Sequence, residues 1–145
     1  GYATTEYLGA ALLDHAWHTL TPDEVPRDVR QVEQFEHQAL AEAGINDALV
    51  PPRYRTTYFS HVFAGGYSAA YYAYIWSEVM DADAIEWFTT DGTIDGDLGL
   101  NRRAGEIFRR EFLSRGDCRD PLVSYRAFTG REPGILPLLQ RRGLA

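Results

Sequence analysis

Residues 61–76 decide the fold, and they read HVFAGGYSAAYYAYIW. A glycine pair, Gly65-Gly66, is followed by Tyr67, Tyr71 and Tyr74, which are spaced i, i+4 and i+7. Residues at this spacing project from one face of a helix. Inside a helix each glycine would cost about 0.8–1.0 kcal/mol relative to alanine. The stretch therefore predicts a break at the glycine pair and a long buried helix over residues 68–88.

Helical periodicity continues on both sides of this stretch. The first helix, capped by Thr4 or Thr5, is expected to bury a stripe that recurs every four residues and that Leu13 and Trp17 widen: Leu8, Leu12, Ala16 and Leu20. The other helices are expected after Pro26 as far as Gly44, over residues 55–63 and 97–114, from Asp120-Pro121 to Gly130, and around Ile135 to Gly143. Asp91-Gly92 and Asp95-Gly96 mark a loop before the helix over residues 97–114, and Leu100 is expected to lie on the inner face of that helix. No strand alternation competes with this pattern, so the fold class is predicted to be all-α, with one helical domain over residues 1–145.

Composition narrows the function classes. The net charge is −7, and the fourteen basic residues are all arginines in short clusters, so no nucleic-acid partner is expected. The longest uncharged stretch, residues 56–77, has polar breaks that make it a poor membrane span, and no membrane partner is expected. Cys118 is the only cysteine, which excludes an internal disulfide and favours a reducing, cytoplasmic location. The first residue is Gly1 rather than Met, which suggests a piece of a longer protein.

Two interpretations of the tyrosines stay open from spacing alone. A phenol is neutral at pH 7 and donates a strong hydrogen bond, so aligned tyrosines could stabilise a developing oxyanion. The same spacing also suits an aromatic core stripe. Gly65-Gly66 could allow a close backbone approach or a hinge, or could simply connect two helices. His61 could donate to a substrate, or could be an interior histidine with its own partner.

A metal centre has little support in the residues. His15 and His18 are three apart on the first predicted helix, but no nearby acidic or cysteine ligand completes a set. The zinc motif H-E-x-x-H does not occur, because no histidine is followed by glutamate. No metal site is therefore assigned to this chain.

Several segments resemble the thimet oligopeptidase family of zinc metallopeptidases. They are residues 52–55 (PRYR), 59–67 (FSHVFAGGY), 71–78 (YYAYIWSE) and 128–133 (FTGREP). The opening residues 1–8 (GYATTEYL), with residues 12–14 (LLD), look closest to the bacterial dipeptidyl carboxypeptidase branch of that family. The neighbouring oligopeptidase A branch stays open as an alternative. The likeness covers essentially the whole chain.

The resemblance implies the helical C-terminal, substrate-binding portion of a two-lobed zincin-like peptidase that releases dipeptides from peptide C-termini. The family's zinc motif and its glutamate ligand would precede Gly1, so this portion would bind no zinc and would be inactive alone. Gly65 and Gly66 would match the family's flexible glycine-rich loop. His61 and Tyr67 would match residues that bind substrate, and Tyr71 and Tyr74 would match tyrosines that also stabilise the tetrahedral intermediate.

The implied partners are short peptide substrates and the N-terminal portion of the same peptidase. The surface that meets that portion would be exposed in the isolated chain, so association into a homo-oligomer is also expected. Two other functions compete with this one. The chain could be a stand-alone helical module that binds peptides or a protein, or an independent metalloenzyme that uses His15 and His18.

Overall fold

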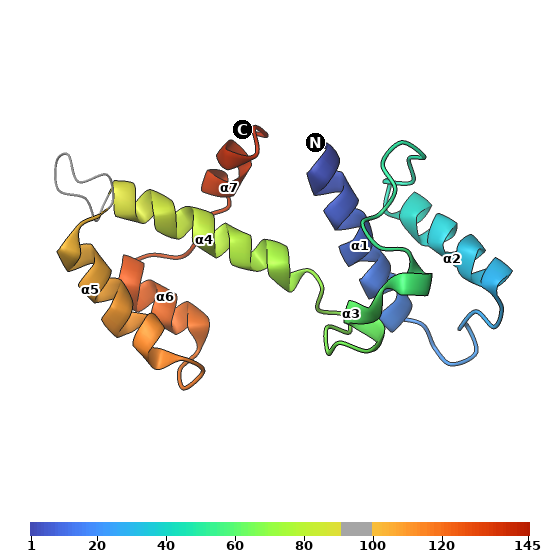
Figure 1. Cartoon of the computed structure of the whole chain (residues 1–145), viewed down its shortest axis with the longest axis horizontal. Coiled ribbons are helices and arrows are strands. Elements are labelled where there is room, and N and C mark those ends of the chain that lie inside the picture. Colours follow the sequence, from blue (N-terminus) through green and yellow to red (C-terminus); the bar gives the residue numbers. More distant parts are fainter. Residues whose placement is uncertain (91–99) are drawn as a thin grey trace. The chain divides into compact units, whose positions relative to one another are not determined.

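The computed structural model describes residues 1–90 and 100–145, and over these residues the fold is all-α (Figure 1). The helices are α1 (Tyr2–His18), α2 (Val29–Glu42), α3 (Ser60–Phe63), α4 (Ala73–Thr89), α5 (Arg102–Glu111), α6 (Pro121–Thr129) and α7 (Leu136–Arg141). Two 3₁₀ turns, Thr56–Tyr58 and Leu113–Arg115, complete the described elements. None of the described helices is both long enough and apolar enough to span a bilayer. The predicted loop at Asp91-Gly92 and Asp95-Gly96 lies outside the described residues.

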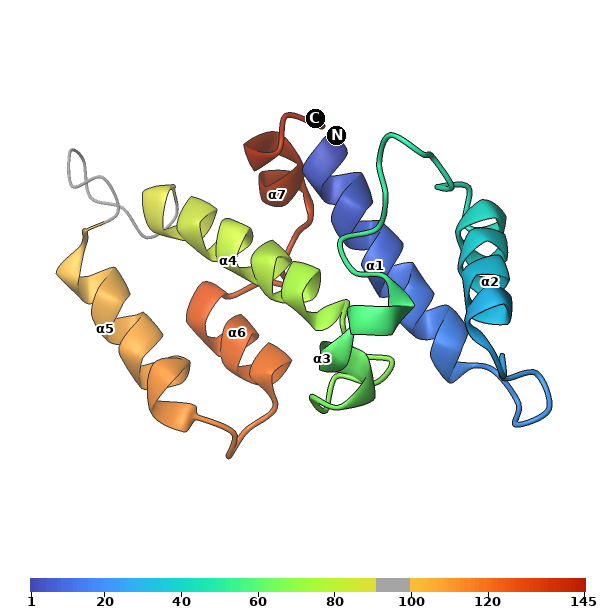
Figure 2. The ribbon, with the colours of Figure 1, turned by 45° about the vertical axis from the view of Figure 1, so that its right-hand side comes forward.

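The chain divides into two compact units, Gly1–Tyr74 and Ile75–Ala145, with the boundary just inside α4. That the two units make up a single domain over residues 1–145 stays a prediction. In the first unit α1 and α2 run side by side, as both views of the ribbon show (Figures 1 and 2). Its core is small and partly aromatic, and consists of Ala10, Ala11, Phe59, Val62 and Tyr71, with Tyr7 and Tyr54 packed against it.

The predicted inner face of α1 was only partly right, because Leu13 is buried as expected but two leucines of the predicted stripe are not. Leu8 and Leu12 are exposed, and the buried residues are Gly9, Ala10, Ala11, Leu13 and Asp14. Small residues on this face let other backbone approach closely, because a Cβ at Gly9 would lie 3.2 Å from Pro52 Cβ. The threonine cap was also wrong, since α1 begins at Tyr2 and its N-cap residue is Gly1.

A buried carboxylate joins α2 to the segment that leads to α3. Glu36 is 3% exposed, accepts a hydrogen bond from Arg55 Nε at 2.6 Å, and accepts another from the backbone amide of Thr56. The helix predicted over residues 55–63 is split at Phe59 into a 3₁₀ turn and α3. Because Glu36 already binds the Thr56 amide, this segment is fixed by a side chain rather than by a continuous helical ladder.

The second unit has its own aromatic core, built from Trp87, Ala104 and Phe128. Here α5 and α6 pack side by side (Figures 1 and 2). The predicted start and end of α6 are confirmed, because the Asp120 side chain accepts from two helix amides and Gly130 is left-handed with φ +78°. Leu100 was predicted to face inward, but it is 87% exposed and precedes the helix, whose N-cap is Asn101.

Candidate functional site

The glycine pair lies in a loop that folds back onto the end of α3. The amide of Tyr67 donates to the His61 carbonyl at 3.1 Å, and Ser68 Oγ donates to the Val62 carbonyl at 2.7 Å. A Cβ on Gly65 would lie 2.9 Å from the His61 carbonyl oxygen, and Gly66 has φ +80°. The structure therefore uses the unusual dihedrals that glycine allows at Gly66, and at Gly65 the close approach of the chain's own backbone. An approach to a ligand and a hinge stay predictions.

The helix predicted from residue 68 begins only at Ala73, which corrects the basis of the tyrosine alignment. Residues 68–72 form turns, and Ala69 has φ +55°, which a helix cannot include. Asp14 of α1 stabilises this conformation, because its carboxylate accepts from the amides of Ala69 and Tyr71, each at 2.9 Å. Tyr67 and Tyr71 thus lie on turns that a buried side chain holds, outside the helix.

The turns nevertheless bring the three tyrosines together. The Tyr74 ring lies 5.3 Å from the Tyr67 ring, which it stacks on, and 5.3 Å from the Tyr71 ring, which it meets edge-on. Tyr67 and Tyr74 are 37% and 42% exposed, whereas Tyr71 is 4% exposed. The core-packing interpretation therefore holds for the Tyr71 ring, and the other two rings are presented to solvent.

The phenols of Tyr71 and Tyr74 keep their protons near neutral pH, because the pKa of each is raised. Burial is the main cause that raises the pKa of Tyr71 to about 12. The pKa of Tyr74 is also raised, chiefly by its hydrogen bond with the Tyr67 side chain. A raised pKa keeps the proton on the phenol, so these groups favour donation to an anionic oxygen over ionisation.

His61 faces the same cluster. Its ring lies 5.8 Å from the Tyr71 ring, 6.4 Å from that of Tyr67 and 5.0 Å from that of Tyr54. Among the described residues its Nδ1 is a buried atom without a hydrogen-bond partner. A buried ring nitrogen without a partner is uncommon, so the prediction of a fully satisfied interior histidine does not fit this structure.

Three residues at this site were not identified by the sequence analysis. The Tyr7 ring stacks on Tyr71 at 5.1 Å, and the Tyr7 hydroxyl donates to the Tyr71 carbonyl. Tyr54 stacks on Phe59 at 5.0 Å, and the Arg53 guanidinium lies 5.9 Å from the Tyr54 ring. A hydrogen bond with Tyr54 is the main cause that raises the pKa of Arg53. The PRYR segment was the available signal for two of them, because the family resemblance already included it.

The described residues do not fit a metal ion. Over residues 1–90 and 100–145 no group of three or more histidine, cysteine or acidic side chains is arranged to hold one. The Nδ1 of His18 lies 2.8 Å from the Asp14 carboxylate, while His15 is exposed and its ring lies 5.6 Å from that of Tyr72. The hypothesis of a metalloenzyme based on these two histidines therefore has no support in this part of the chain.

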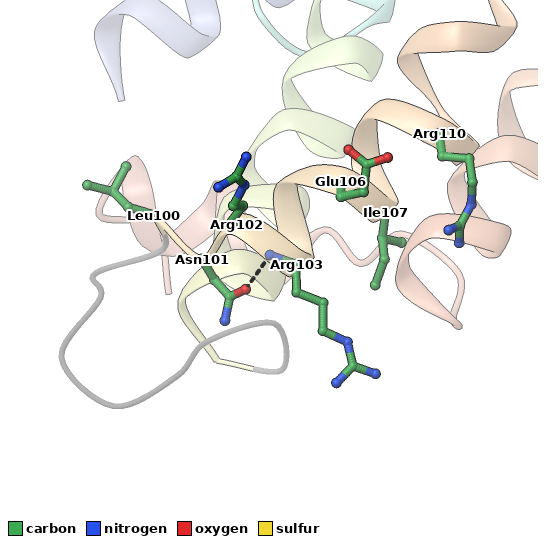
Figure 3. A pocket seen from close by; sticks show the side chains of 7 residues that line it. All are labelled: Leu100, Asn101, Arg102, Arg103, Glu106, Ile107 and Arg110. Carbon is green, nitrogen blue, oxygen red and sulfur yellow. Dashed lines mark hydrogen bonds between the residues drawn. The ribbon is translucent and has the colours of Figure 1, made fainter.

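A hollow of about 1010 Å³ beside α5 contains none of the predicted site residues (Figure 3). Arginines 102, 103 and 110 line it, and the Arg102 and Arg103 guanidinium groups point in different directions. Asn101 Oδ1 already accepts from the helix amides of Arg103 and Ala104, at 2.8 and 3.1 Å. The first amides of this helix are thus in use, and we assign no ligand to the hollow.

The matches to known proteins agree with one another. The model of peptidase family M3 matches residues 1–144. Dipeptidyl carboxypeptidase of Salmonella typhimurium is 46% identical over 144 residues, and that of Escherichia coli is 44% identical over 144 residues. Oligopeptidase A of Haemophilus influenzae is 33% identical over 127 residues, which are 88% of this chain and 17% of that protein.

The matches to the two dipeptidyl carboxypeptidases cover 99% of this chain but only 20% of each of those proteins. The chain therefore spans about a fifth of the length of these relatives. The segments with resemblance that were quoted from the sequence, from residue 1 to residue 133, all lie inside the matched range.

Proposed function

The chain belongs to peptidase family M3, and we propose that it is the substrate-binding and transition-state-stabilising part of a zinc-dependent peptidase. The complete enzyme would release dipeptides from the C-termini of short peptides, as the names of its relatives suggest. The zinc motif H-E-x-x-H does not occur in the sequence, and the described residues contain no group that fits a metal ion, so the zinc would be held by residues outside this chain. The isolated chain would then be inactive. A cytoplasmic location, argued from the single cysteine, is part of the proposal.

The exposed phenol of Tyr74 carries this proposal. It stacks on Tyr67 beside the glycine loop, and its raised pKa keeps its proton available near neutral pH. Tyr74 would donate a hydrogen bond to the oxygen on which negative charge develops during peptide-bond cleavage. Tyr71 would be a second donor, and this role requires its hydroxyl to become accessible, because the residue is only 4% exposed.

The residues beside these donors would bind the peptide itself. Gly65 and Gly66 leave the loop without side chains where it meets the tyrosines, so a peptide backbone could lie close to it. Tyr67 offers an exposed ring, and the Nδ1 of His61 has no partner within the described residues. We assign substrate contacts to these four residues and oxyanion stabilisation to Tyr71 and Tyr74.

Replacing Tyr74 with phenylalanine in the complete peptidase tests the proposal. Tyr74→Phe removes one hydroxyl and keeps the stacked ring, and the loss of one preorganised donor lowers kcat by about 10²–10³-fold. The KM for a short peptide should change little, because the lost interaction belongs to the transition state. Tyr72→Phe is the matched control, since Tyr72 is 48% exposed and outside the ring cluster, and it should keep the wild-type kcat. A wild-type kcat for Tyr74→Phe would refute the oxyanion role.

The exposed tyrosine rings also favour one alternative, a stand-alone module that binds peptides or a partner protein. Such a module would need neither zinc nor the remainder of a peptidase. The two proposals differ in where peptide affinity resides. Saturable peptide binding by this chain alone would favour the module, whereas binding and hydrolysis that appear only with the N-terminal portion of the peptidase would favour the enzyme.

A further inference from the structure

The turn that carries the tyrosines is fixed by one buried carboxylate. Asp14 is completely buried on α1, its Oδ1 accepts from the Ala69 amide, and its Oδ2 accepts from the Tyr71 amide, each at 2.9 Å. From this geometry we infer that Asp14 is a positioning residue, which holds residues 69–71 so that the phenols of Tyr71 and Tyr74 point at the reacting carbonyl. This inference rests on the proposed function.

A carboxylate is the group that this turn requires. Ala69 has φ +55°, a conformation that costs free energy for any residue with a Cβ. The two amides converge on separate oxygens of one side chain, so both acceptor atoms are used. Asparagine has the same shape but only one acceptor oxygen, and its NH₂ group would face one of the two amide donors.

The link from Asp14 to the tyrosines runs through the backbone of Tyr71. The Tyr71 amide donates to Asp14, and the Tyr71 carbonyl accepts from the hydroxyl of Tyr7, seven residues before Asp14 on α1. Both backbone groups of Tyr71 are thus bound to one helix. The Tyr71 ring then meets the Tyr74 ring at 5.3 Å, so a shift of the turn would also move the exposed phenol.

The carboxylate itself is held in place. His18 lies one turn further along α1, and its Nδ1 is 2.8 Å from Asp14 Oδ1. The complete burial of Asp14 keeps it away from any substrate. Its effect on the reaction must therefore pass through the tyrosines, and this distinguishes it from a catalytic residue.

A double-mutant cycle in the complete peptidase tests this role. Asp14→Asn should lower kcat by about 10–100-fold, because a small misplacement of a catalytic group is enough for such a loss. In a Tyr74→Phe background the same change should lower kcat by a smaller factor, since one of the two phenols that Asp14 positions is already lost. Destabilisation alone would lower kcat by the same factor in both backgrounds. Asp23→Asn, an exposed aspartate on the same unit, is the matched control and should behave as wild type.

One further measurement and one further variant keep the test decisive. Hydrogen exchange at the Ala69 amide or at the Tyr71 amide should become faster in Asp14→Asn, because asparagine has one acceptor oxygen and one of the two amides loses its acceptor. If Asp14→Asn does not fold, Asp14→Asn combined with Ala69→Gly replaces it in the cycle, since glycine relieves the left-handed strain.

The outcomes separate this inference from the proposed function. Equal kcat losses in both backgrounds, a wild-type kcat for Asp14→Asn, or unchanged exchange at both the Ala69 and the Tyr71 amides would each overturn the inference. A wild-type kcat for Tyr74→Phe alone would refute the proposed function and the kinetic part of the inference together. Exchange at the Ala69 and Tyr71 amides would then still decide whether Asp14 holds the turn.

Discussion

The buried carboxylate of Asp83 should stabilise the second unit by several kcal/mol. Asp83 is 1% exposed, and its two carboxylate oxygens accept hydrogen bonds from Arg131 Nη1 at 2.7 and 2.6 Å. The carboxylate also accepts from the Gly134 amide at 3.0 Å and from the Tyr125 hydroxyl. Asp83→Asn would keep the shape but remove the charge and one acceptor. Removing one partner of a buried ion pair costs about 3–5 kcal/mol, and the Arg131 side chain is 36% exposed, so we expect the lower end of that range.

Urea unfolding of the chain, followed through the fluorescence of Trp87 after Trp17 and Trp76 are replaced with phenylalanine, measures this cost. Trp87 is 7% exposed and its ring lies 4.5 Å from that of Phe128, so its signal reports on the core of the second unit. A loss of about 3 kcal/mol corresponds to a change of roughly 10²-fold in the folding equilibrium constant. The midpoint of unfolding should fall while the slope with urea stays constant.

The effect should depend on pH with a definite sign. Burial alone raises the pKa of Asp83, but hydrogen bonds from Arg131, Tyr125 and Gly134 lower it more, so its pKa lies below the usual aspartate value. A depressed pKa in the folded state means that the stabilisation is complete above the unfolded value, about 3.9. It is lost as pH falls through the lower, folded pKa. The difference between wild type and Asp83→Asn should therefore shrink below about pH 4.

Asp81→Asn is the matched control, because it makes the same change two residues away on α4. The Asp81 side chain is 59% exposed and forms a surface ion pair with Arg141 at 2.7 Å, so its replacement should cost only about 0–1 kcal/mol. An Asp83→Asn variant as stable as Asp81→Asn would contradict the reasoning. A stability difference that widens as pH falls below 4 would contradict the assigned direction of the pKa shift.

Two further predictions concern the first unit. The pKa of Tyr71 is raised to about 12, so its stabilising contribution is complete below pH 10 and is lost between about pH 10 and 12. When tyrosinate absorbance is titrated with base, Tyr71→Phe should remove one phenol that ionises late. An unchanged titration curve at high pH would contradict this. Gly65→Ala would place a Cβ 2.9 Å from the His61 carbonyl, and overpacking of this kind costs about 1–3 kcal/mol; thermal unfolding should show a lower Tm than wild type, and an equal Tm would mean that the loop can move away.

Local signals in the sequence were enough to predict some elements. Asp120-Pro121 and Gly130 bound α6 as expected, because capping depends on residues within one turn of the helix end. Periodicity also identified the all-α class. The inner face of α1 could not be read in this way, because its buried residues are mostly small, and larger apolar residues such as Leu8 and Leu12 lie on the exposed side.

The candidate site was only partly predictable for a physical reason. The segment from His61 to Tyr74 does bring its aromatic residues together, but not through the helical alignment that the spacing indicated. The left-handed Ala69 and the start of α4 at Ala73 depend on Asp14, which is more than fifty residues away in sequence. No pattern within a single window of sequence contains such a contact.

Asp14 belongs to a wider pattern of buried acids in this chain. Asp14, Glu36 and Asp83 are each at most 3% exposed, and each accepts a backbone amide of a non-helical segment. These amides belong to Ala69 and Tyr71, to Thr56, and to Gly134, respectively. The described residues form no strand, so a connecting segment that packs against a helix must find acceptors on side chains, because an unpaired buried amide is costly.

This pattern supplies the signal that the sequence analysis lacked. Asp83 lies four residues after Val79 and four before Trp87, so an acid occupies a position where helical spacing calls for an apolar side chain. Asp14 likewise follows Leu13 and Ala10 on the buried face of α1. An ionised side chain at such a position is too costly to bury without partners. Acids on the buried face of a helix therefore indicate where connecting segments, including the one with the tyrosines, are attached.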